Sequence, residues 1–296
     1  MTIRLTGTRR CRALLASIRY DEIVVLQGAP VLGAVFAIGA LDAVRVWNLV
    51  LLVLANAALV AHVFLLNDWA GIEHDSRDPA RASRVFLQRG VSHREIGVLV
   101  LLTLVLSVAG LAWLGRTPLL LGLLLMMASA LYSLPQVSVK GVPLANSLLH
   151  FVTGVLHFLM GYAVYREIDV GGVVIGLFFA VVFSAGHLTQ EVRDAEADAR
   201  NGIRTNAVCF GRRTCFLVAF GLFTLANALL VALALQGRVP DALVAVVALA
   251  YPVHALWTWQ ALREGLPHVS VRRLQVRYRV LYAGIGLAMV TSLLLV

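Results

Sequence analysis

The sequence predicts an all-α, polytopic membrane protein, and three observations lead to this fold class. Sixty per cent of its 296 residues are hydrophobic and only 14% are charged, a balance well outside that of soluble domains. Apolar segments run from one end of the chain to the other, with no Pro/Ser-rich or low-complexity linker between them. In lipid, a helix satisfies its own backbone hydrogen bonds. We therefore expect residues 1–296 to form a single integral membrane domain.

Nine windows without charged residues are each near the roughly 20 residues that a helix needs to cross a bilayer. They lie at residues 23–40, 46–66, 96–114, 117–139, 141–165, 170–190, 214–237, 242–262 and 280–296. The apolar run after the basic first 22 residues lacks a small-residue cleavage site, so we interpret it as an anchor rather than a removable signal peptide. Pro135 should break the fourth helix near its end.

Basic residues divide unevenly between the two sides of such a bundle. In a nine-span arrangement, 21 of the 25 Lys and Arg residues lie on one side, and the other side has only Arg45, Arg116, Arg166 and Arg238. Because basic loops stay in the cytoplasm, we predict a cytoplasmic N-terminus and a C-terminus on the opposite side of a cell membrane. Membrane topology also explains the net charge of +9, so the expected partner is the lipid bilayer and not nucleic acid.

Two acidic clusters follow the second and sixth windows, on the side that we predict to be cytoplasmic. Asp194 and Asp198 are four residues apart, so they share one face if the sixth helix extends that far. Mg²⁺ takes one or two carboxylates and completes its octahedron with water and phosphate oxygens. The two clusters are therefore predicted to be the halves of one metal site, with the candidate ligands Asn67, Asp68, Glu73, Asp75, Asp194 and Asp198.

Basic residues alternate with these acidic residues, and a guanidinium group matches the geometry of phosphate oxygens. A diphosphate bridged by the metal is therefore the expected ligand. Lys140 is the only lysine among the basic residues, and it could reach an anionic ligand from the third cytoplasmic loop together with Tyr132. The predicted diphosphate contacts are Asn67, Arg77, Arg84, Lys140, Arg193 and Arg204.

A single acidic loop in a membrane protein is more often a solvated turn than a binding site. Two such loops on the same side, each at the end of a full span and each mixing Asp with Arg, are not needed for topology, which requires only Lys and Arg. The duplication favours the metal site.

The segments NDWAGIEHD and DAEADARNGIRT resemble the two aspartate-rich motifs of the UbiA superfamily of intramembrane prenyltransferases, NDxxDxxxD and DxxxD, which have Tyr and Lys in an intervening loop. The resemblance extends over essentially the whole chain. Gly71 stands where the first motif has its middle aspartate, and Tyr132 to Lys140 is longer than the compact YxxxK form. The matching residues are Asn67, Asp68 and Asp75 in the first motif, Asp194 and Asp198 in the second, Gly202 and Thr205 in its tail, and Arg84 downstream of the first.

This resemblance implies Mg²⁺-dependent transfer of a polyprenyl group from a prenyl diphosphate to an aromatic or other lipid-precursor acceptor. Mg²⁺ and basic side chains would stabilise the departing diphosphate, and the residues implied in catalysis are Asp68, Asp75, Tyr132, Lys140, Asp194 and Asp198. A terpene cyclase on the same scaffold stays open, because it would use the same diphosphate site. A transporter is the other alternative, but it would place carboxylates near the middle of its spans, where this chain has neither Asp nor Glu.

Five histidines lie inside the apolar windows: His62, His150, His157, His187 and His254. An ionisable group inside a span is often functional, although a hydrogen bond to a neighbouring helix is at least as common a role. His187 is seven residues, or two helical turns, before Asp194, so it could share the face of Asp194 and act as a base or an acceptor contact.

Overall fold

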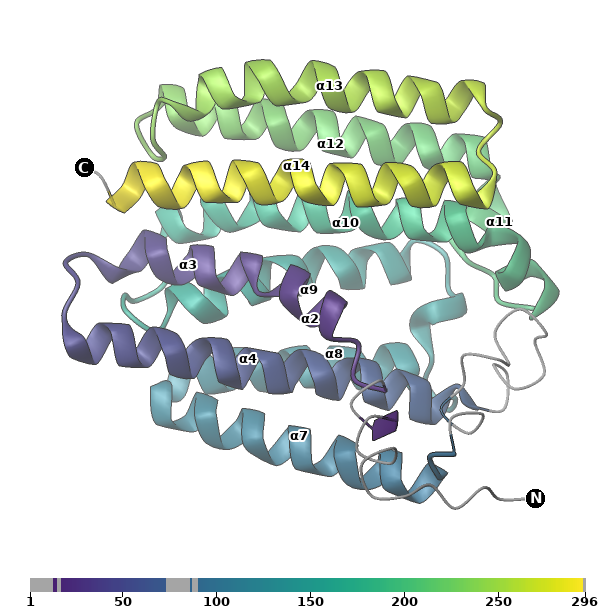
Figure 1. Cartoon of the computed structure of the whole chain (residues 1–296), viewed down its shortest axis with the longest axis horizontal. Helices are drawn as coiled ribbons and strands as arrows, with labels where there is room; N and C mark the ends of the chain where they lie inside the picture. Colours follow the sequence, from purple (N-terminus) through teal and green to yellow (C-terminus); the bar gives the residue numbers. More distant parts are fainter. Residues whose placement is uncertain (1–12, 15–16, 73–85, 87–89, 295–296) are drawn as a thin grey trace.

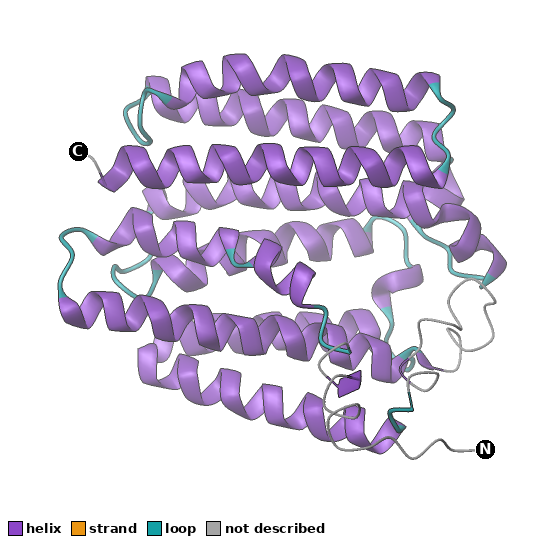
Figure 2. Ribbon diagram, in the orientation of Figure 1, coloured by secondary structure: helices purple, strands orange, loops and turns teal. Residues whose placement is uncertain are grey.

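The computed structural model describes residues 13–14, 17–72, 86 and 90–294. Within these residues the chain is helical and has no strand, which confirms the predicted all-α class (Figure 2). The helices are α2 (Tyr20–Leu26), α3 (Gly28–Ile38), α4 (Ala43–Ala70), α7 (His93–Leu114), α8 (Arg116–Ser133), the 3₁₀ turn η2 (Val139–Gly141), α9 (Ala145–Tyr162), α10 (Val170–Arg200), α11 (Asn206–Phe210), α12 (Arg212–Leu235), α13 (Leu243–Arg263) and α14 (His268–Leu294).

The long helices lie nearly side by side in one bundle (Figure 1). Near one edge of the view α4 packs against α7, and near the other α10 packs against α12, while α9 lies between and contacts α10, α8 and α3. The last helix, α14, contacts α3, so helices from the first and last parts of the described chain pack together. A cavity is lined by residues of both α4 and α10.

Helix covers part or all of each of the nine predicted windows, but not every helix has the length and composition of a membrane span. In the described part of the chain, seven helical segments are long and apolar enough to cross a membrane, when Tyr20–Ile38 is taken as one segment. The helices α9 and α14 are not among them. A multi-pass membrane protein is therefore confirmed, and the number of nine spans stays a prediction.

The first predicted window, residues 23–40, is divided into α2 and α3 at Gln27. Pro30 has no backbone N–H, so it cannot donate to the carbonyl oxygen of Leu26 one turn earlier. The Nδ2 of Asn56 on α4 lies 3.3 Å from this oxygen and donates to it instead. A side chain from another helix thus replaces the missing intrahelical hydrogen bond.

The segment between the last two windows, residues 263–279, is mostly helical, because α14 already begins at His268. Charged residues interrupt the apolar pattern there, but Val271, Leu274 and Tyr278 recur at helical spacing and are buried. The prediction that Pro135 ends the fourth helix agrees with α8, which ends at Ser133. The sixth helix extends past its window to Arg200, as the acidic spacing required.

Candidate active site

A cavity of about 1270 Å³ opens among α2, α3, α4, α8, α9, α10 and α14. Along α10 its lining extends from Phe178 to Asp198, which is roughly 30 Å of helix. Charged residues line the end near Asp198, and apolar residues such as Phe179 and Met289 line the other parts. The cavity can therefore accept a charged head at one end and an apolar chain over most of its length.

The first acidic segment reaches this cavity from the last turn of α4, where Asn67 and Asp68 both line it. The guanidinium group of Arg19 forms an ion pair with the carboxylate of Asp68. Gly71 ends the helix, and its N–H donates to the carbonyl oxygen of Asn67 at 2.9 Å. The other predicted residues of this segment, Glu73, Asp75, Arg77 and Arg84, lie outside the described residues.

The second acidic segment belongs entirely to α10, and both of its aspartates line the same cavity. Asp198 is buried, whereas the side chain of Asp194 is 29% exposed. Arg193 donates to the two carboxylate oxygens of Asp194 at 2.8 and 2.6 Å and to Gln275 Oε1 on α14 at 2.7 Å. Asp194 is therefore held by a charged network that joins α10 to α14.

The tail of the second segment turns sharply at the end of α10. Gly202 has a φ of +70°, a conformation that favours glycine, and the N–H of Ile203 donates to the carbonyl oxygen of Asp198 at 2.9 Å. This turn brings Thr205 to the cavity wall, where it is buried. Its Oγ1 has no hydrogen-bond partner within the described part of the structure, so a ligand could supply one.

The predicted pair from the third loop also reaches the cavity. Tyr132 lies in the last turn of α8 and Lys140 in η2, and both line the cavity wall. Ser138 Oγ donates to the carbonyl oxygen of Tyr132 at 3.0 Å, which fixes the connection between them. Arg204 is different, because it is exposed and does not line the cavity.

The described residues suit a magnesium–diphosphate complex in their chemistry, although they form no ready-made metal cluster. No group of three or more His, Cys, Asp or Glu residues in the described ranges lies close enough together to hold a metal ion. Mg²⁺ does not need such a group when phosphate and water complete its octahedron. Asn67, Asp68, Asp194 and Asp198 present hard oxygen atoms to one cavity from two helices, and Thr205 adds a buried hydroxyl group without a partner.

Sequence analysis missed several charged residues that line the cavity. Arg19 and Glu22 belong to the basic N-terminal region of the sequence, and His268, Arg272 and Arg279 lie between the last two windows. Arg279 donates to both carboxylate oxygens of Glu22 at 3.1 to 3.2 Å, which joins α14 to α2. The repetition of apolar residues after His268 was the signal for a helix that presents these basic residues to the cavity.

Glu191 is a further acidic residue of the cavity wall, but it is buried within a polar network. Its carboxylate accepts hydrogen bonds from Asn146 Nδ2 at 2.8 Å, Asn206 Nδ2 at 3.1 Å and the N–H of Ala207 at 3.3 Å. The Nε2 of His187 lies 3.0 Å from the same carboxylate. These contacts join α9, α10 and α11 beside the charged end of the cavity.

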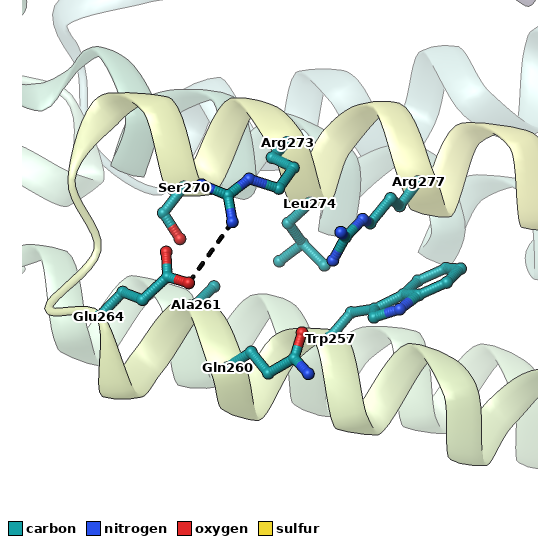
Figure 3. A pocket seen from close by; sticks show the side chains of 8 residues that line it. All are labelled: Trp257, Gln260, Ala261, Glu264, Ser270, Arg273, Leu274 and Arg277. Atoms are coloured by element: carbon teal, nitrogen blue, oxygen red, sulfur yellow. Dashed lines mark hydrogen bonds and ion pairs between the residues drawn. The ribbon is translucent and has the colours of Figure 1, made fainter.

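A second pocket lies between α13 and α14 (Figure 3). Its volume is only about 10 Å³, enough for about one water molecule. Arg273 reaches toward Glu264 across it, with 3.5 Å between Nη1 and Oε1, and the guanidinium group of Arg277 lies 5.5 Å from the ring centre of Trp257. This pocket is a site of helix packing and not a candidate active site.

The sequence model of the UbiA prenyltransferase family matches residues 28–277. No relative among the curated protein sequences matches the chain. A UbiA homologue from Archaeoglobus fulgidus bound to GPP and Mg²⁺ is 18% identical, with a TM-score of 0.71 over 94% of this chain and 99% of that one. The apo structure of a UbiA homologue from Aeropyrum pernix K1 is 18% identical, with a TM-score of 0.72 over 92% and 98%.

A structure of digeranylgeranylglyceryl phosphate synthase is 15% identical, with a TM-score of 0.72 over 97% of this chain and 99% of that one. At such identities these likenesses show a common fold. They place the whole described bundle, and not only its motifs, within that fold.

Proposed function

Because the chain belongs to the UbiA prenyltransferase family, we propose that it transfers a prenyl group from a prenyl diphosphate to an aromatic or other lipid-precursor acceptor within the membrane. One observation carries this proposal. The acidic residues that end α4 and α10, far apart in the sequence, line a single cavity that continues into an apolar interior. A diphosphate with an isoprenoid tail has the same division between a charged and an apolar part.

The cofactor in this proposal is Mg²⁺, which is bound together with GPP or DMAPP in the A. fulgidus homologue. When bound, the ion would neutralise the negative charge that develops on the departing diphosphate. Asn67, Asp68, Asp194 and Asp198 would hold it from the two helices, with Glu73 and Asp75 as further candidate ligands.

The diphosphate itself would bind to basic side chains around the charged end of the cavity. Lys140 and Arg193 line this end and were predicted for this role, and Arg77, Arg84 and Arg204 stay candidates for it. The hydroxyl group of Tyr132, which lines the same cavity, would donate a hydrogen bond to a diphosphate oxygen. A guanidinium group that contacts a carboxylate in the free protein can turn to a phosphate oxygen when the carboxylate takes up a metal.

The isoprenoid tail would occupy the apolar length of the cavity, between α3, α10 and α14. Phe178, Phe179, Leu32 and Met289 line this part, and their contact with the tail removes apolar surface from water. Aromatic walls could also stabilise an allylic cation, so a terpene cyclase is the second candidate function.

Incubation of the purified protein with geranyl diphosphate and Mg²⁺, with and without aromatic acceptors, tests the proposal. A prenylated acceptor supports it, whereas a cyclic hydrocarbon formed without any acceptor supports the cyclase. Release of diphosphate should stop in EDTA. No consumption of geranyl diphosphate under any of these conditions would rule out both functions.

The proposed orientation has nine spans, a cytoplasmic cavity mouth and an exported C-terminus, because the basic residues divide in that way. Single cysteines introduced at positions 78 and 200 should react with an impermeant reagent only from the cytoplasmic side. Cysteines at positions 167 and 238 should react only from the other side. Opposite labelling of 78 and 200 would contradict a site that both acidic segments share.

A further inference from the structure

Two histidines from neighbouring helices stack face to face on the cavity wall. The ring centres of His150 on α9 and His187 on α10 are 3.5 Å apart, and the rings are inclined by only 9°. Both line the cavity. Tyr132 also lines the cavity, and its ring is nearly perpendicular to that of His150, with 5.3 Å between the ring centres. The cavity wall therefore contains two imidazole rings that do not belong to either aspartate-rich motif.

The hydrogen bonds of His150 determine which nitrogen can take up a proton. Its Nδ1 lies 2.9 Å from the carbonyl oxygen of Asn146. A carbonyl oxygen can only accept, so Nδ1 carries the hydrogen and, in the neutral ring, Nε2 carries the lone pair. His150 is thus held in the tautomer in which Nε2 is basic.

A buried negative charge stands beside the pair. The Nε2 of His187 is 3.0 Å from the carboxylate of Glu191, which also accepts a hydrogen bond from Asn146 Nδ2 at 2.8 Å. The residue that orients His150 is therefore fixed by the same carboxylate that contacts His187. His187 and the residue that orients His150 are thus anchored to one buried carboxylate.

The position of the pair along α10 also suits a role in prenyl transfer. His187 is seven residues before Asp194 on α10, which is roughly 10 Å along the helix axis, and Phe183, one turn further from Asp194, also lines the cavity. The pair is thus located between the charged end and the apolar part. The first carbon of a prenyl chain whose diphosphate lies near Asp194 and Asp198 would come to this level.

We propose that His150, stacked on His187, is the general base that accepts the proton of a hydroxylated acceptor during prenyl transfer. This inference rests on the proposed function. The bond between the prenyl carbon and oxygen breaks, and its electron pair leaves with the diphosphate. The acceptor donates an electron pair to that carbon to form the new bond, and its proton goes to Nε2 of His150 and later to water.

Other titratable groups surround the pair and will influence its pH dependence. They include Tyr132 on α8, Lys140 in η2, Glu191 on α10 and Tyr278 on α14, which line the same cavity. Glu191 carries a negative charge 3.0 Å from Nε2 of His187. Its substitution should therefore change the pH profile of transfer more than substitution of the others.

The test uses 4-nitrophenol as a probe of proton transfer, because its phenolate form absorbs visible light. We expect the apparent pKa of 4-nitrophenol bound to the wild-type protein to be about one unit, or tenfold, lower than in His150→Phe. Phe keeps an aromatic ring in the stack but cannot accept a proton. His150→Gln should behave like His150→Phe, and His187→Asn should show part of the loss. With a phenolic acceptor, both His150 variants should lower kcat for transfer about 100-fold.

His62→Gln is the matched control, because His62 is also buried and its Nδ1 also contacts a carbonyl oxygen, that of Val100, but it does not line the cavity. Release of diphosphate from geranyl diphosphate, measured with and without a phenolic acceptor, separates the possible failures. If wild type and the His150 variants all release diphosphate but bind 4-nitrophenol with the same apparent pKa, the inference is wrong and the proposed function stands. If wild type releases none even with an acceptor, the proposed function is wrong and so is the inference. If the His150 variants lose a release that wild type shows without an acceptor, the pair stabilises the cation and is not the base.

Discussion

The two acidic segments contribute to one cavity in different ways. The second segment lies on continuous helix, since α10 extends to Arg200 and carries both Asp194 and Asp198. The first segment crosses the end of a helix, since α4 ends at Ala70 and residues 73–85 lie outside the described residues. Helical spacing is therefore sufficient to place both side chains of the second segment, but it places only Asn67 and Asp68 of the first.

The segments also differ in the origin of their arginine partners. Asp194 pairs with its immediate neighbour Arg193, whereas Asp68 pairs with Arg19, which is 49 residues away in the sequence. The Asp194–Arg193 pair lies on one helix, whereas the Asp68–Arg19 pair depends on how α2 approaches α4. We expect the second segment to bind its ligand with less rearrangement, and the first to complete the site only when metal and diphosphate arrive.

The largest expected effect is loss of activity when the second segment loses a carboxylate. Asp198→Asn or Asp194→Asn should lower turnover of geranyl diphosphate by about 10²- to 10³-fold, because an amide oxygen neutralises none of the metal's charge. Glu196→Gln is the matched control, since Glu196 is on the same helix but is 74% exposed and pairs with Arg212. Wild-type activity in either Asp variant, or full activity in EDTA, would contradict a metal site on α10.

A smaller effect is expected when the arginine partners are removed. Arg19→Gln and Arg193→Gln should each raise the KM for prenyl diphosphate about tenfold, because each guanidinium group can form charge-assisted hydrogen bonds with phosphate. Arg193→Gln should also lower the unfolding temperature, because Arg193 joins Asp194 to Gln275 on α14. A change in stability without any change in KM would make these arginines structural only.

Local sequence patterns could predict the helical class, the extension of α10 and the common face of its aspartates, because these features depend on spacing along one helix. The contact of Arg19 with Asp68 could not be predicted in this way, because it depends on the packing of two helices. The same holds for the stacking of His150 on His187. A pattern on one helix indicated that His187 faces the ligand, but its partner comes from another helix.

Gly71 provides a sharper comparison of the two segments, since it replaces the middle aspartate of the family motif. Its φ is −87°, which any residue can adopt, so a side chain there adds no backbone strain. Gly71→Asp should lower the Mg²⁺ concentration for half-maximal rate about threefold, because a carboxylate replaces water as a ligand. Glu73→Gln should raise it by a similar factor.

A Mg²⁺ titration of wild type and the two variants measures both effects. A lower maximal rate in Gly71→Asp would mean that Glu73 already fills the coordination sphere and that the new carboxylate crowds it. If neither variant changes the dependence on Mg²⁺, the first segment does not bind metal through this part, and its ligands would be Asn67, Asp68 and Asp75 alone.

The smallest expected effect concerns the other ends of the two helices, which both begin with an aspartate cap. Asp42 accepts a hydrogen bond from the N–H of Arg45 at 2.8 Å, and Asp169 accepts one from the N–H of Gly172 at 2.7 Å. The hydrogen bond from Gly172 lowers the pKa of Asp169 below its ordinary value of 3.8. Its carboxylate therefore stabilises the folded protein above that value, and this stabilisation is lost as the pH falls through the lower pKa of the folded state.

Asp169→Asn keeps an oxygen that can accept the hydrogen bond but removes the charge, so it should lower the unfolding temperature only slightly at neutral pH. The loss should be small because Asp169 is exposed to solvent. Asp42→Asn makes the same change at the start of α4 and is the matched comparison at neutral pH. The difference between wild type and Asp169→Asn should shrink as the pH is lowered below 3.8, because wild-type Asp169 then becomes neutral as well. Thermal unfolding in detergent over a series of pH values measures this, and a difference that stays constant to the lowest pH would show that the charge of Asp169 does not stabilise α10.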